Sequence, residues 1–444
     1  FHLSTALRNQ TWKEAKKTKH KMDIHLDGRL GVLHSGLSDE DFRSFQKLVH
    51  EYGEYNLNTD GKTIKAGVGI GEGIPVESEE AKKAFGSGRT IHHQRVLNNN
   101  GTEMIFPPRA DNAIKVDELM ESHGSIYGRQ TYTQRDGAFF RGLYAVIDRN
   151  GRMRKAEGNA SDALTLHVQE VMGKRFAAAA QKLFGTPLVV PKMFFGNLLL
   201  PGQEIGMHHD VPEFRGIHPR TAPNWLQIAM HGSGLFGRWR ILQAAALTYY
   251  QHMERGNLAV YSPNGEGIII PANPKLGVVV EAETCAHHSD VFEPKHQRHW
   301  TDPPSGSKLG YVESEECWLL AAADGSELQR FRPDEVRVST QMKLHCFRSQ
   351  EEERMYLERT DDLSIEQALD MMTDDLRRRG WFHGPDPCKA DLAMMIVKEY
   401  VHWPVPEAVA RCWAQQPDSV FARAALGSPI ASLKPPTRPL QSKL

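Results

Sequence analysis

The sequence predicts an α+β fold, in which a jelly-roll core of antiparallel strands is flanked by N-terminal and C-terminal helices. Three observations predict it. Between residues 188 and 347, eight short apolar runs are separated by Gly and Pro, which is typical of antiparallel sandwiches and barrels. Eight is also the strand number of a jelly roll. The segments on either side have helical periodicity and capping residues instead.

The eight runs are LVVPKMFFGNLLLPG, EIGMHHDV, NWLQIAMHGSG, GNLAVYSPNG, GIIIPA, LGVVVEAETCAHHSDV, ECWLLAAADG and EVRVSTQMKLHCF. Around them we expect four regions. These are a helical and loop-rich N-terminal region with strands that support the barrel (1–187), the jelly-roll core (188–347), a helical region (348–426) and a Pro-rich tail (427–444).

At the N-terminal side, residues 1–60 predict helix, with a capping sequence at Ser38 and an end at Gly53. Residues 56–115 are rich in Gly, Asn and Pro. The GVGIGEG run within them lacks the Lys-Ser/Thr ending of a phosphate-binding loop, so we interpret it as a flexible turn.

Strands and then a long helix should precede the core. Residues 131–148 predict one or two strands, followed by a hairpin turn at Asn150-Gly151. The Ala-rich segment 160–185 predicts a helix that ends at Gly185.

After the core, the pattern returns to helix. A capping sequence at Ser364 opens a helix that stops at Gly380, and at least two more helices are expected between Lys389 and Leu426.

The composition favours a protein that acts on a small molecule. With 444 residues the chain can bury a large core, and 54 Lys+Arg against 55 Asp+Glu give no field that would attract nucleic acid or an anionic membrane. Five scattered cysteines without CxxC spacing fit a reducing compartment, so we expect a cytoplasmic location. The sequence has no membrane-length apolar run, and its polar N-terminal segment does not read as a secretory signal.

A candidate metal site lies at His208-His209-Asp210, after a Pro-Gly turn and a short apolar run. Residues two positions apart on an extended strand point to the same side, so His208 and Asp210 can bind one cation while His209 points away. The segment CAHHSD (285–290), at the end of another apolar run, supplies a third ligand. Two imidazoles and one carboxylate on one face of an octahedron form the facial triad that binds ferrous iron.

The third ligand is either His287 or His288. If Val278 and Val280 face the core, strand alternation makes even positions inward and favours His288. A bulge within residues 283–285 would shift this parity and favour His287. We take His288 as the expected ligand.

An arginine could complete the site. Arg298 lies ten residues after His288, about the length of a turn and a return strand, and its guanidinium could hold a buried carboxylate with two charge-assisted bonds. Arg337 is the competing candidate, because it shares a strand face with Ser339, whose hydroxyl could add a third bond.

The ordered set of an HxD pair, a distal histidine and a following arginine resembles the iron(II)- and 2-oxoglutarate-dependent dioxygenases, over about residues 188–347. The resemblance implies a double-stranded β-helix, the cupin-like form of the jelly roll, and an oxidoreductase that uses Fe(II), 2-oxoglutarate and O2. It implies that iron is bound by His208, Asp210 and His288, and the distal carboxylate of 2-oxoglutarate by Arg298.

Two details of the resemblance concern the cosubstrate. The family usually places the arginine about ten positions after the distal histidine, which favours Arg298 over Arg337. Some members carry a serine two positions after the arginine, whereas this chain has Trp300 there, which departs from the pattern. Asn197, inward on the preceding strand if Leu198 faces out, would add a hydrogen bond to the cosubstrate.

The stretches PGQEIGMHHDVPEFRG and NWLQIAMHGSGLF resemble the branch that modifies free amino acids, including the lysine halogenases. Those halogenases replace the carboxylate ligand with a small residue to admit halide. Here Asp210 is present, which implies oxygen chemistry: hydroxylation, or desaturation or cyclisation, with succinate and CO2 as coproducts.

An amino-acid substrate would need a cation for its carboxylate and an acid for its ammonium. Glu213 is the candidate for the ammonium, and the candidates for the carboxylate are Arg141, Arg215, Arg220 and His231.

Three other functions remain open on the sequence. One is a cupin-like isomerase or metal-binding protein that does not use 2-oxoglutarate. Another is a hydroxylase of a macromolecule, held by the flanking regions, although the chain lacks the aromatic and basic pattern of nucleic-acid binding. The third is a non-catalytic scaffold, which would have little reason to keep all three ligands. The oligomeric state is not predicted.

Overall fold

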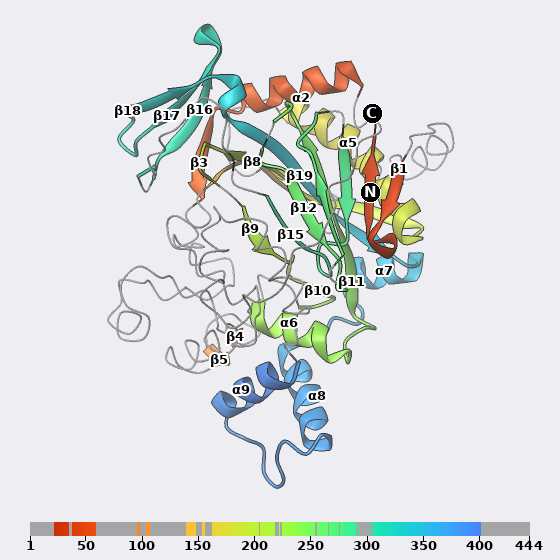
Figure 1. The fold of residues 1–444 in the computed structure, drawn as a ribbon. Helices are drawn as coiled ribbons and strands as arrows, with labels where there is room; N and C mark the ends of the chain where they lie inside the picture. Colours follow the sequence, from red (N-terminus) through yellow and green to blue (C-terminus); the bar gives the residue numbers. More distant parts are fainter. Residues whose placement is uncertain are drawn as a thin grey trace.

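The computed structural model describes residues 22–34, 38–58, 96–97, 104–106, 139–147, 153–155, 162–203, 205–217, 222, 224–253, 255–264, 266–274, 276–289, 292, 303–304 and 306–400. For some of these, including His208 and Arg141, only the backbone is described. Over these ranges the chain combines helices with antiparallel sheets (Figure 1).

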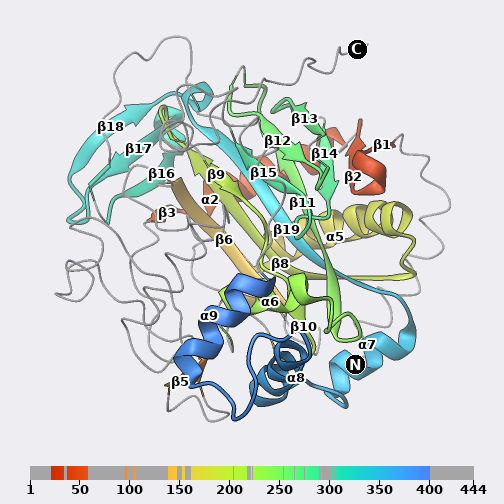
Figure 2. The same cartoon turned by 60° about the horizontal axis from the view of Figure 1, so that its bottom comes forward.

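The larger sheet has β19 and β8 near its centre, and Figure 2 shows β19 running between β8 and β11. Along the main path its strands are, in spatial order, β1 (Met22–His25), β2 (Leu30–Leu33), β14 (Gly277–Val280), β11 (Arg240–Tyr249), β19 (Arg337–Phe347), β8 (Leu188–Leu199), β6 (Phe139–Ile147), β3 (Glu54–Asn58), β16 (Lys308–Val312), β17 (Cys317–Ala321) and β18 (Glu327–Phe331). Off this path, β10 (Glu213–Phe214) pairs with β11 and β7 (Met153–Lys155) pairs with β6.

The smaller sheet has four strands, in the order β13 (Gly267–Ile270), β12 (Leu258–Tyr261), β15 (Ala286–Ser289) and β9 (Ile205–His208). A separate pair joins β4 (Val96–Leu97) to β5 (Met104–Phe106). Between β8 and β19 the chain passes repeatedly from one of the two main sheets to the other. The strands β8, β11, β14 and β19 lie in the larger sheet, and β9, β12, β13 and β15 lie in the smaller one.

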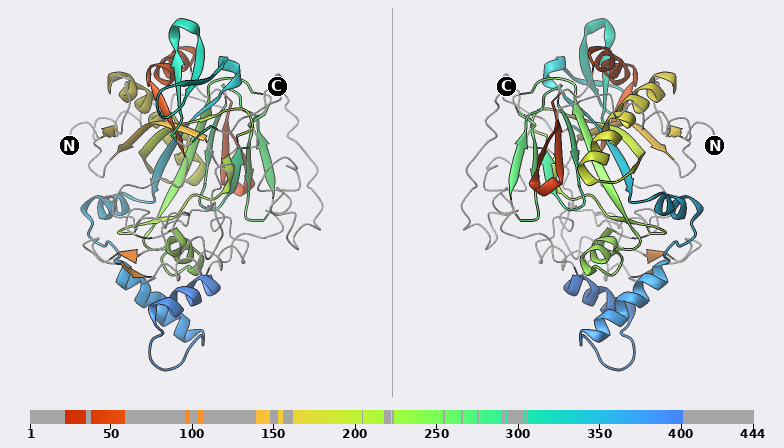
Figure 3. Two further views of the ribbon diagram at one scale, coloured as in Figure 1. Left: turned by 90° about the vertical axis from the view of Figure 1, so that its left-hand side faces the viewer. Right: turned by 90° about the vertical axis from the view of Figure 1, so that its right-hand side faces the viewer.

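The helices are α2 (Asp39–Glu51), α5 (Asp162–Phe184), α6 (Asn224–Ser233), α7 (Gln350–Glu358), α8 (Ile365–Arg378) and α9 (Lys389–Tyr400). Short 3-10 turns lie at Leu26–Gly28, Glu313–Glu315 and Pro333–Glu335. The side views of Figure 3 place α8 and α9 at one end of the molecule and the β16–β18 ribbon at the other. None of the helices within the described ranges combines the length and apolar character needed to cross a membrane.

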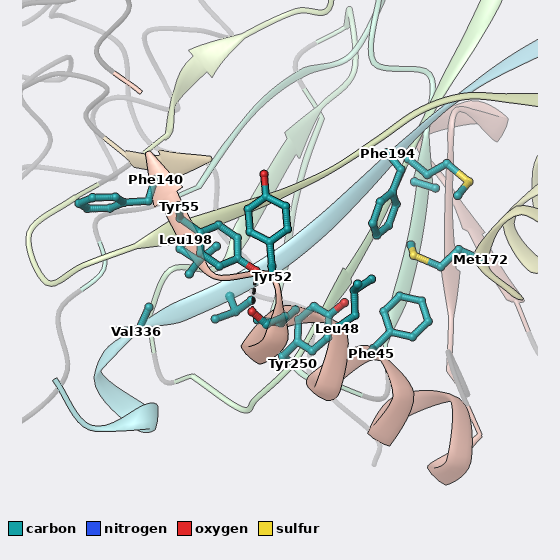
Figure 4. Close-up of a cluster of buried hydrophobic side chains, with 14 of the residues drawn as sticks. Phe45, Leu48, Tyr52, Tyr55, Phe140, Met172, Phe194, Leu198, Tyr250 and Val336 are labelled. Atoms are coloured by element: carbon teal, nitrogen blue, oxygen red, sulfur yellow. Dashed lines mark hydrogen bonds between the residues drawn. The ribbon is translucent and has the colours of Figure 1, made fainter. Parts of the chain in front are cut away.

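Among the residues that the structure describes, three buried clusters divide the core. The first lies between α2, α5 and the outer face of the larger sheet, and Figure 4 shows Phe45 and Leu48 of α2 with Phe194 and Leu198 of β8. The second lies between the two main sheets and contains Leu199, with the other members coming from β2, β11, β12, β13 and β14 and from adjoining turns and loops. The third joins β12 and β15 to α6, α8 and α9. Each β8 face therefore contributes to a different cluster.

Several predicted elements are confirmed. Ser38 accepts a hydrogen bond from the Asp41 N–H and caps α2, and Ser364 and Gln367 form a capping box on α8. The helix expected over 160–185 is α5, and Gly185 follows it with a φ of 64°. The β6 and β7 strands pair as a hairpin, although its turn at Asn150-Gly151 lies outside the described residues.

Two predictions were wrong. Residues 22–33 are the strands β1 and β2 rather than helix, because they extend the edge of the larger sheet beside β14. In the same region predicted as helix, residues 54–58 form the strand β3, which pairs with β6 and β16. The run NWLQIAMHGSG is helix α6 rather than a strand. Its buried residues Leu226, Ala229 and Met230 are spaced three and four apart, which is the spacing of one helix face.

The sequence reading also missed a central strand and merged two others. Residues 240–249 form β11 although their Ala-rich run has low strand propensity, because packing on both sheet faces overrides that propensity. The run LGVVVEAETCAHHSDV contains two strands, β14 and β15, in different sheets. The turn between them is closed by a hydrogen bond from the Cys285 N–H to the Glu281 carbonyl at 3.0 Å.

Gly216 lies in the segment after Asp210 and generates a prediction about stability. Its φ is 91°, and a Cβ there would lie 2.3 Å from the Leu363 carbonyl oxygen. Gly216→Ala should lower the free energy of unfolding by about 2–5 kcal/mol, from about 1–2 for the left-handed backbone and about 1–3 for overpacking. Gly234→Ala is the control, because Gly234 has a φ of 70° with open space around it. Denaturant unfolding measures both variants. If Gly216→Ala lowers the free energy of unfolding no more than Gly234→Ala does, the Leu363 backbone moves aside at little cost.

Candidate functional site

The antiparallel pair β9 and β15 brings the two histidine segments together at the edge of the smaller sheet. His208, the last residue of β9, is the register partner of His287 on β15, and Ile205 is the partner of Ser289. Because β9 has one residue more than β15 between these two pairs, the strands contain a bulge-like irregularity there. Residues directly opposite on antiparallel strands lie on the same sheet face. The register therefore relates His208 to His287 rather than to His288.

His287 and His288 belong to opposite faces of β15. His288 is the partner of Ala259, and its ring stacks on Tyr261 at a centroid distance of 5.9 Å and an interplanar angle of 10°. Ala259 and Tyr261 belong to the cluster that contains α6, α8 and α9. His287 is instead the partner of Val260, which belongs to the cluster between the sheets. His287 thus lies on the inner side.

A backbone carbonyl sets the tautomer of His287. Its Nδ1 lies 3.0 Å from the Cys285 carbonyl oxygen, and the ring is buried. Since a carbonyl only accepts, Nδ1 must carry the proton, and in the neutral ring Nε2 is then the nitrogen with the lone pair. Metal-binding histidines are held in this way by a bond from their other ring nitrogen.

Asp210 is held at the end of β9 through both its backbone and its side chain. Its N–H donates to the Ala282 carbonyl at 2.8 Å, which ties it to the turn before β15. Its carboxylate forms an ion pair with Lys343 of β19. Both side chains are mostly covered, with exposed fractions of 19% for Asp210 and 13% for Lys343.

The β19 strand has a polar face toward the cluster between the sheets. The apolar residues Val338, Met342, Leu344 and Cys346 pack against α2 and α5 on the other side. Since side chains alternate along a strand, the opposite face carries the remaining residues. These are Arg337, Ser339, Gln341, Lys343 and His345, with Phe347 at the end of the strand, whereas Thr340 lies on the outer face beside Met172.

Arg337 links this polar face of β19 to the strand that carries His287. Its guanidinium is 1% exposed and donates from Nη2 to Ser289 Oγ at 2.9 Å and from Nε to the Gly256 carbonyl at 2.6 Å. It also stacks over the Tyr249 ring at 5.1 Å. Because Ser289 is two residues after His287, both lie on the same face of β15. The guanidinium therefore lies between the two sheets.

Of two further residues predicted to bind the cosubstrate, the structure describes Asn197 but not Arg298. Asn197 is buried and opposite Ser339, and its carbonyl accepts a hydrogen bond from Ser339 Oγ at 3.3 Å. Leu198 packs in the outer cluster, as expected if Asn197 points inward. Arg298 lies outside the described residues.

Two of the residues predicted to bind substrate already have strong partners. Glu213 accepts from Lys192 and lies 3.3 Å from His345 Nε2. Arg215 is 1% exposed and donates to both carboxylate oxygens of Asp361, at 2.7 and 2.8 Å. Arg215 thus fastens the segment after Asp210 to the region before α8.

The remaining residues predicted to bind substrate are His231, Arg141 and Arg220. His231 lies in the last turn of α6, where burial, and secondarily the positive charge of Arg240, lowers its pKa to about 4. It is therefore neutral at pH 7 and poorly suited to bind a carboxylate by charge. The backbone of Arg141 is opposite Asn197, and Arg220 lies outside the described residues.

Three residues that contact Asp210 or Glu213 were not predicted from the sequence: Lys343, His345 and Lys192. The alternation of polar and apolar residues in RVSTQMKLHCF could have revealed the first two, because it predicts one polar face on a central strand. No sequence signal points to Lys192. It is the extra residue at a β-bulge, since Met193 is opposite Lys343 and Pro191 is opposite Leu344. Bulges commonly redirect a side chain in this way.

Among the side chains that the structure describes, no three His, Cys, Asp or Glu residues form a group that could hold a metal ion. The side chain of His208 is not among them, so the trio predicted from the sequence stays a prediction.

No family model and no curated protein matches the chain. Among solved structures it is similar to an oxidoreductase of the 2OG-Fe(II) oxygenase family from Burkholderia pseudomallei (11% identity, TM-score 0.27, 47% of this chain and 66% of that one). That match spans less than two thirds of the other protein's length. It is also similar to a Pseudomonas putida prolyl-4-hydroxylase (10% identity, TM-score 0.25, 52% of this chain and 82% of that one). A third similar structure is the carbocyclase SnoK from nogalamycin biosynthesis (11% identity, TM-score 0.26, 74% of this chain and 94% of that one).

The Arg215–Asp361 pair generates a second prediction. Arg215→Met should lower the free energy of unfolding at pH 7 by about 3–5 kcal/mol, because it leaves a mostly buried carboxylate without its main partner. Arg238→Met is the control, since Arg238 lies 3.9 Å from the same carboxylate but is 70% exposed, and it should cost less than about 1 kcal/mol.

The same pair predicts a pH dependence. Hydrogen bonds from Arg215 hold the pKa of Asp361 below its ordinary value. A depressed carboxyl pKa stabilises the folded state above the unfolded pKa of about 3.9, and this stability is lost as pH falls through the folded pKa. The difference between the native protein and Arg215→Met should therefore narrow below about pH 4. A difference that is constant with pH would contradict this account.

Proposed function

We propose that this chain is an iron(II)- and 2-oxoglutarate-dependent oxygenase, an oxidoreductase that oxidises an unactivated C–H bond of a small molecule. One observation carries the proposal: the register pairs His208 with His287, and Ser289 on the same face binds the buried guanidinium of Arg337. A metal-ligand segment and an anion-binding group thus lie on neighbouring inner positions. Asp210 follows His208 by two residues and is tied to the turn before β15.

The strand order supports the jelly-roll part of the proposal. The chain alternates between the two sheets from β8 to β19, so that segments distant in sequence face each other across one apolar cluster. Two sheets of four strands each, connected in this way, are what a double-stranded β-helix requires. The strands β6, β3 and β16–β18 extend the larger sheet on one side of that unit, and β2 and β1 extend it on the other.

The residues fit a bound iron ion. His208, Asp210 and His287 would hold it, and the bond from His287 Nδ1 to the Cys285 carbonyl puts the lone pair of the neutral ring on Nε2, which suits a metal ligand. The bound ion, together with 2-oxoglutarate and O2, would supply the oxidation of a C–H bond, with succinate and CO2 as coproducts. The apolar side chains between the sheets would keep water from the site.

Arg337 suits the distal carboxylate of 2-oxoglutarate. Ser339 follows it by two positions, which is the arrangement that some relatives of this class show after their arginine. Bonds to Gly256 and Ser289 hold the guanidinium in one orientation before any ligand binds, which lowers the entropic cost of binding. We therefore favour Arg337 over Arg298, and His287 over His288.

We further propose that the substrate is an amino acid or a molecule of similar size and charge, modified by hydroxylation or by desaturation or cyclisation. The sequence stretch around His208 supports this, whereas Arg215 and Glu213 serve other contacts. The direct experiment is anaerobic titration with Fe(II) and 2-oxoglutarate, followed by measurement of succinate in air over a panel of amino acids. Substrate-dependent succinate is the expected result. Binding of metal without 2-oxoglutarate would favour a cupin-like metal protein instead.

The choice of histidine can be tested by metal binding alone. Loss of a hydrogen-bond partner of a metal ligand weakens metal binding by roughly 10–100-fold. His287→Ala should weaken Co(II) binding by more than this, because it removes a ligand itself. His288→Ala should change the affinity only a few-fold. Titration calorimetry measures both, with thermal unfolding as a check on folding. The reverse order would assign the ligand to His288.

The choice of arginine can be tested without replacing it. Gly256 has a φ of 80°, and a Cβ there would lie 2.6 Å from Arg337 Cδ. Gly256→Ala should displace the guanidinium and weaken 2-oxoglutarate binding by about 10–100-fold, the loss of a charged hydrogen bond of about 1.5–3 kcal/mol. Binding of Co(II) alone should be unchanged. If Arg298→Met abolishes 2-oxoglutarate binding while Gly256→Ala does not, the clamp is Arg298.

A further inference from the structure

Lys343 is a cation on the polar inner face of β19. It is directly opposite Ala245 on β11 and Met193 on β8, which offer no charged or polar side-chain group. Its ammonium forms an ion pair with Asp210, one of the proposed iron ligands. The same carboxylate thus has two uses, one toward a lysine and one toward a metal ion.

These two uses compete. In the structure, Lys343 Nζ contacts Asp210 Oδ2 directly. A divalent cation bound to that carboxylate would draw its oxygens toward itself and repel the ammonium by charge. Metal binding should therefore loosen the contact between Lys343 and Asp210.

Resting on the proposed function, we infer that Lys343 is a substrate-binding residue that becomes available when metal binds to Asp210. The freed ammonium then binds a carboxylate or another anionic group of the substrate. The chain thus acts on an anionic small molecule, whose charged end is held beside the metal. Binding of metal and of this anion is then mutually favourable, because each relieves a cost of the other.

A count of charges supports an anion. Iron(II) on Asp210 leaves one positive charge, and dianionic 2-oxoglutarate on Arg337 leaves one negative charge, so these two cancel. Lys343 then adds a positive charge in a mostly covered position, and burying an uncompensated charge is costly. An anionic substrate group would compensate it.

The neighbouring acid is already used. Glu213 accepts from Lys192, whose side chain a β-bulge directs to it, and it also lies 3.3 Å from His345. His345 is the next inner-face residue after Lys343, and Gln341, the previous one, is uncharged. The residues beside Lys343 on β19 thus contribute no carboxylate to replace Asp210.

Amine labelling of the full chain followed by peptide mass spectrometry tests the release of Lys343. Adding Mn(II) should raise acylation of Lys343 several-fold, while Lys192, which stays on Glu213, serves as the internal control. Unchanged labelling of Lys343 with Mn(II) bound would overturn the inference and leave the proposed function intact. Failure of Mn(II) to bind at all would overturn both the inference and the proposed function on which it rests.

Removing the competitor gives an independent measurement. Lys343→Met should bind Mn(II) at least 5-fold more tightly than the native chain, because no ion pair must be broken. Lys192→Met should bind Mn(II) with the native affinity. Weaker or equal binding by Lys343→Met, with native thermal unfolding, would mean that Lys343 supports the carboxylate rather than competing for it.

The anion is tested with propionate as the probe and 1-propanol as its uncharged control. In the chain loaded with Mn(II) and 2-oxoglutarate, propionate should lower the labelling of Lys343 again, and propanol should not. If 2-oxoglutarate alone restores full protection, the anion at Lys343 is the cosubstrate's and the assignment to substrate is wrong. If propionate gives no protection at millimolar concentration, Lys343 is not an anion site.

Discussion

The pairing of β9 with β15 is the constraint on which the site depends. Because side chains alternate along a strand, a slip of one residue would exchange His287 for His288 across from His208. Three contacts oppose such a slip. β12 holds β15 on its other side, the Asp210 N–H binds the Ala282 carbonyl, and Arg337 binds Ser289. Backbone pairing thus sets how the two histidine segments lie relative to each other.

The polar face of β19 adds charged and hydrogen-bonded contacts to the apolar packing between the two main sheets. Burying a guanidinium or an ammonium between sheets costs free energy unless each is bonded. Here the cost is offset locally. Arg337 is bonded to three neutral oxygens, of Gly256, Ser289 and Ser339, and stacks on an aromatic ring, and Lys343 is paired with Asp210. Replacing such groups by well-packed apolar residues often stabilises a protein, so the presence of these two charges supports the binding roles proposed for them.

Much of the fold could be predicted from the sequence, and the rest failed for physical reasons. Helices α5 and α8 were predictable because their caps and periodicity are local signals. Strand β11 was not, since its Ala-rich run becomes a strand only through packing on both of its faces. Alternation counted from Val278 could not decide between the two histidines, because the Glu281–Cys285 turn between β14 and β15 interrupts it.

The sequence predicts candidate metal ligands, which stay a prediction, but it does not predict the contacts around them. The spacing of His208 and Asp210 indicates a metal pair, whereas the contact of Asp210 with Lys343 joins residues 133 positions apart and has no local signal. The same is true of Arg215 and Asp361, which hold the segment after Asp210 against the chain before α8. Gly216 allows that close approach, since any side chain there would meet the Leu363 backbone. The chain just before the C-terminal helix α8 therefore contacts the candidate site indirectly, through the segment that follows Asp210.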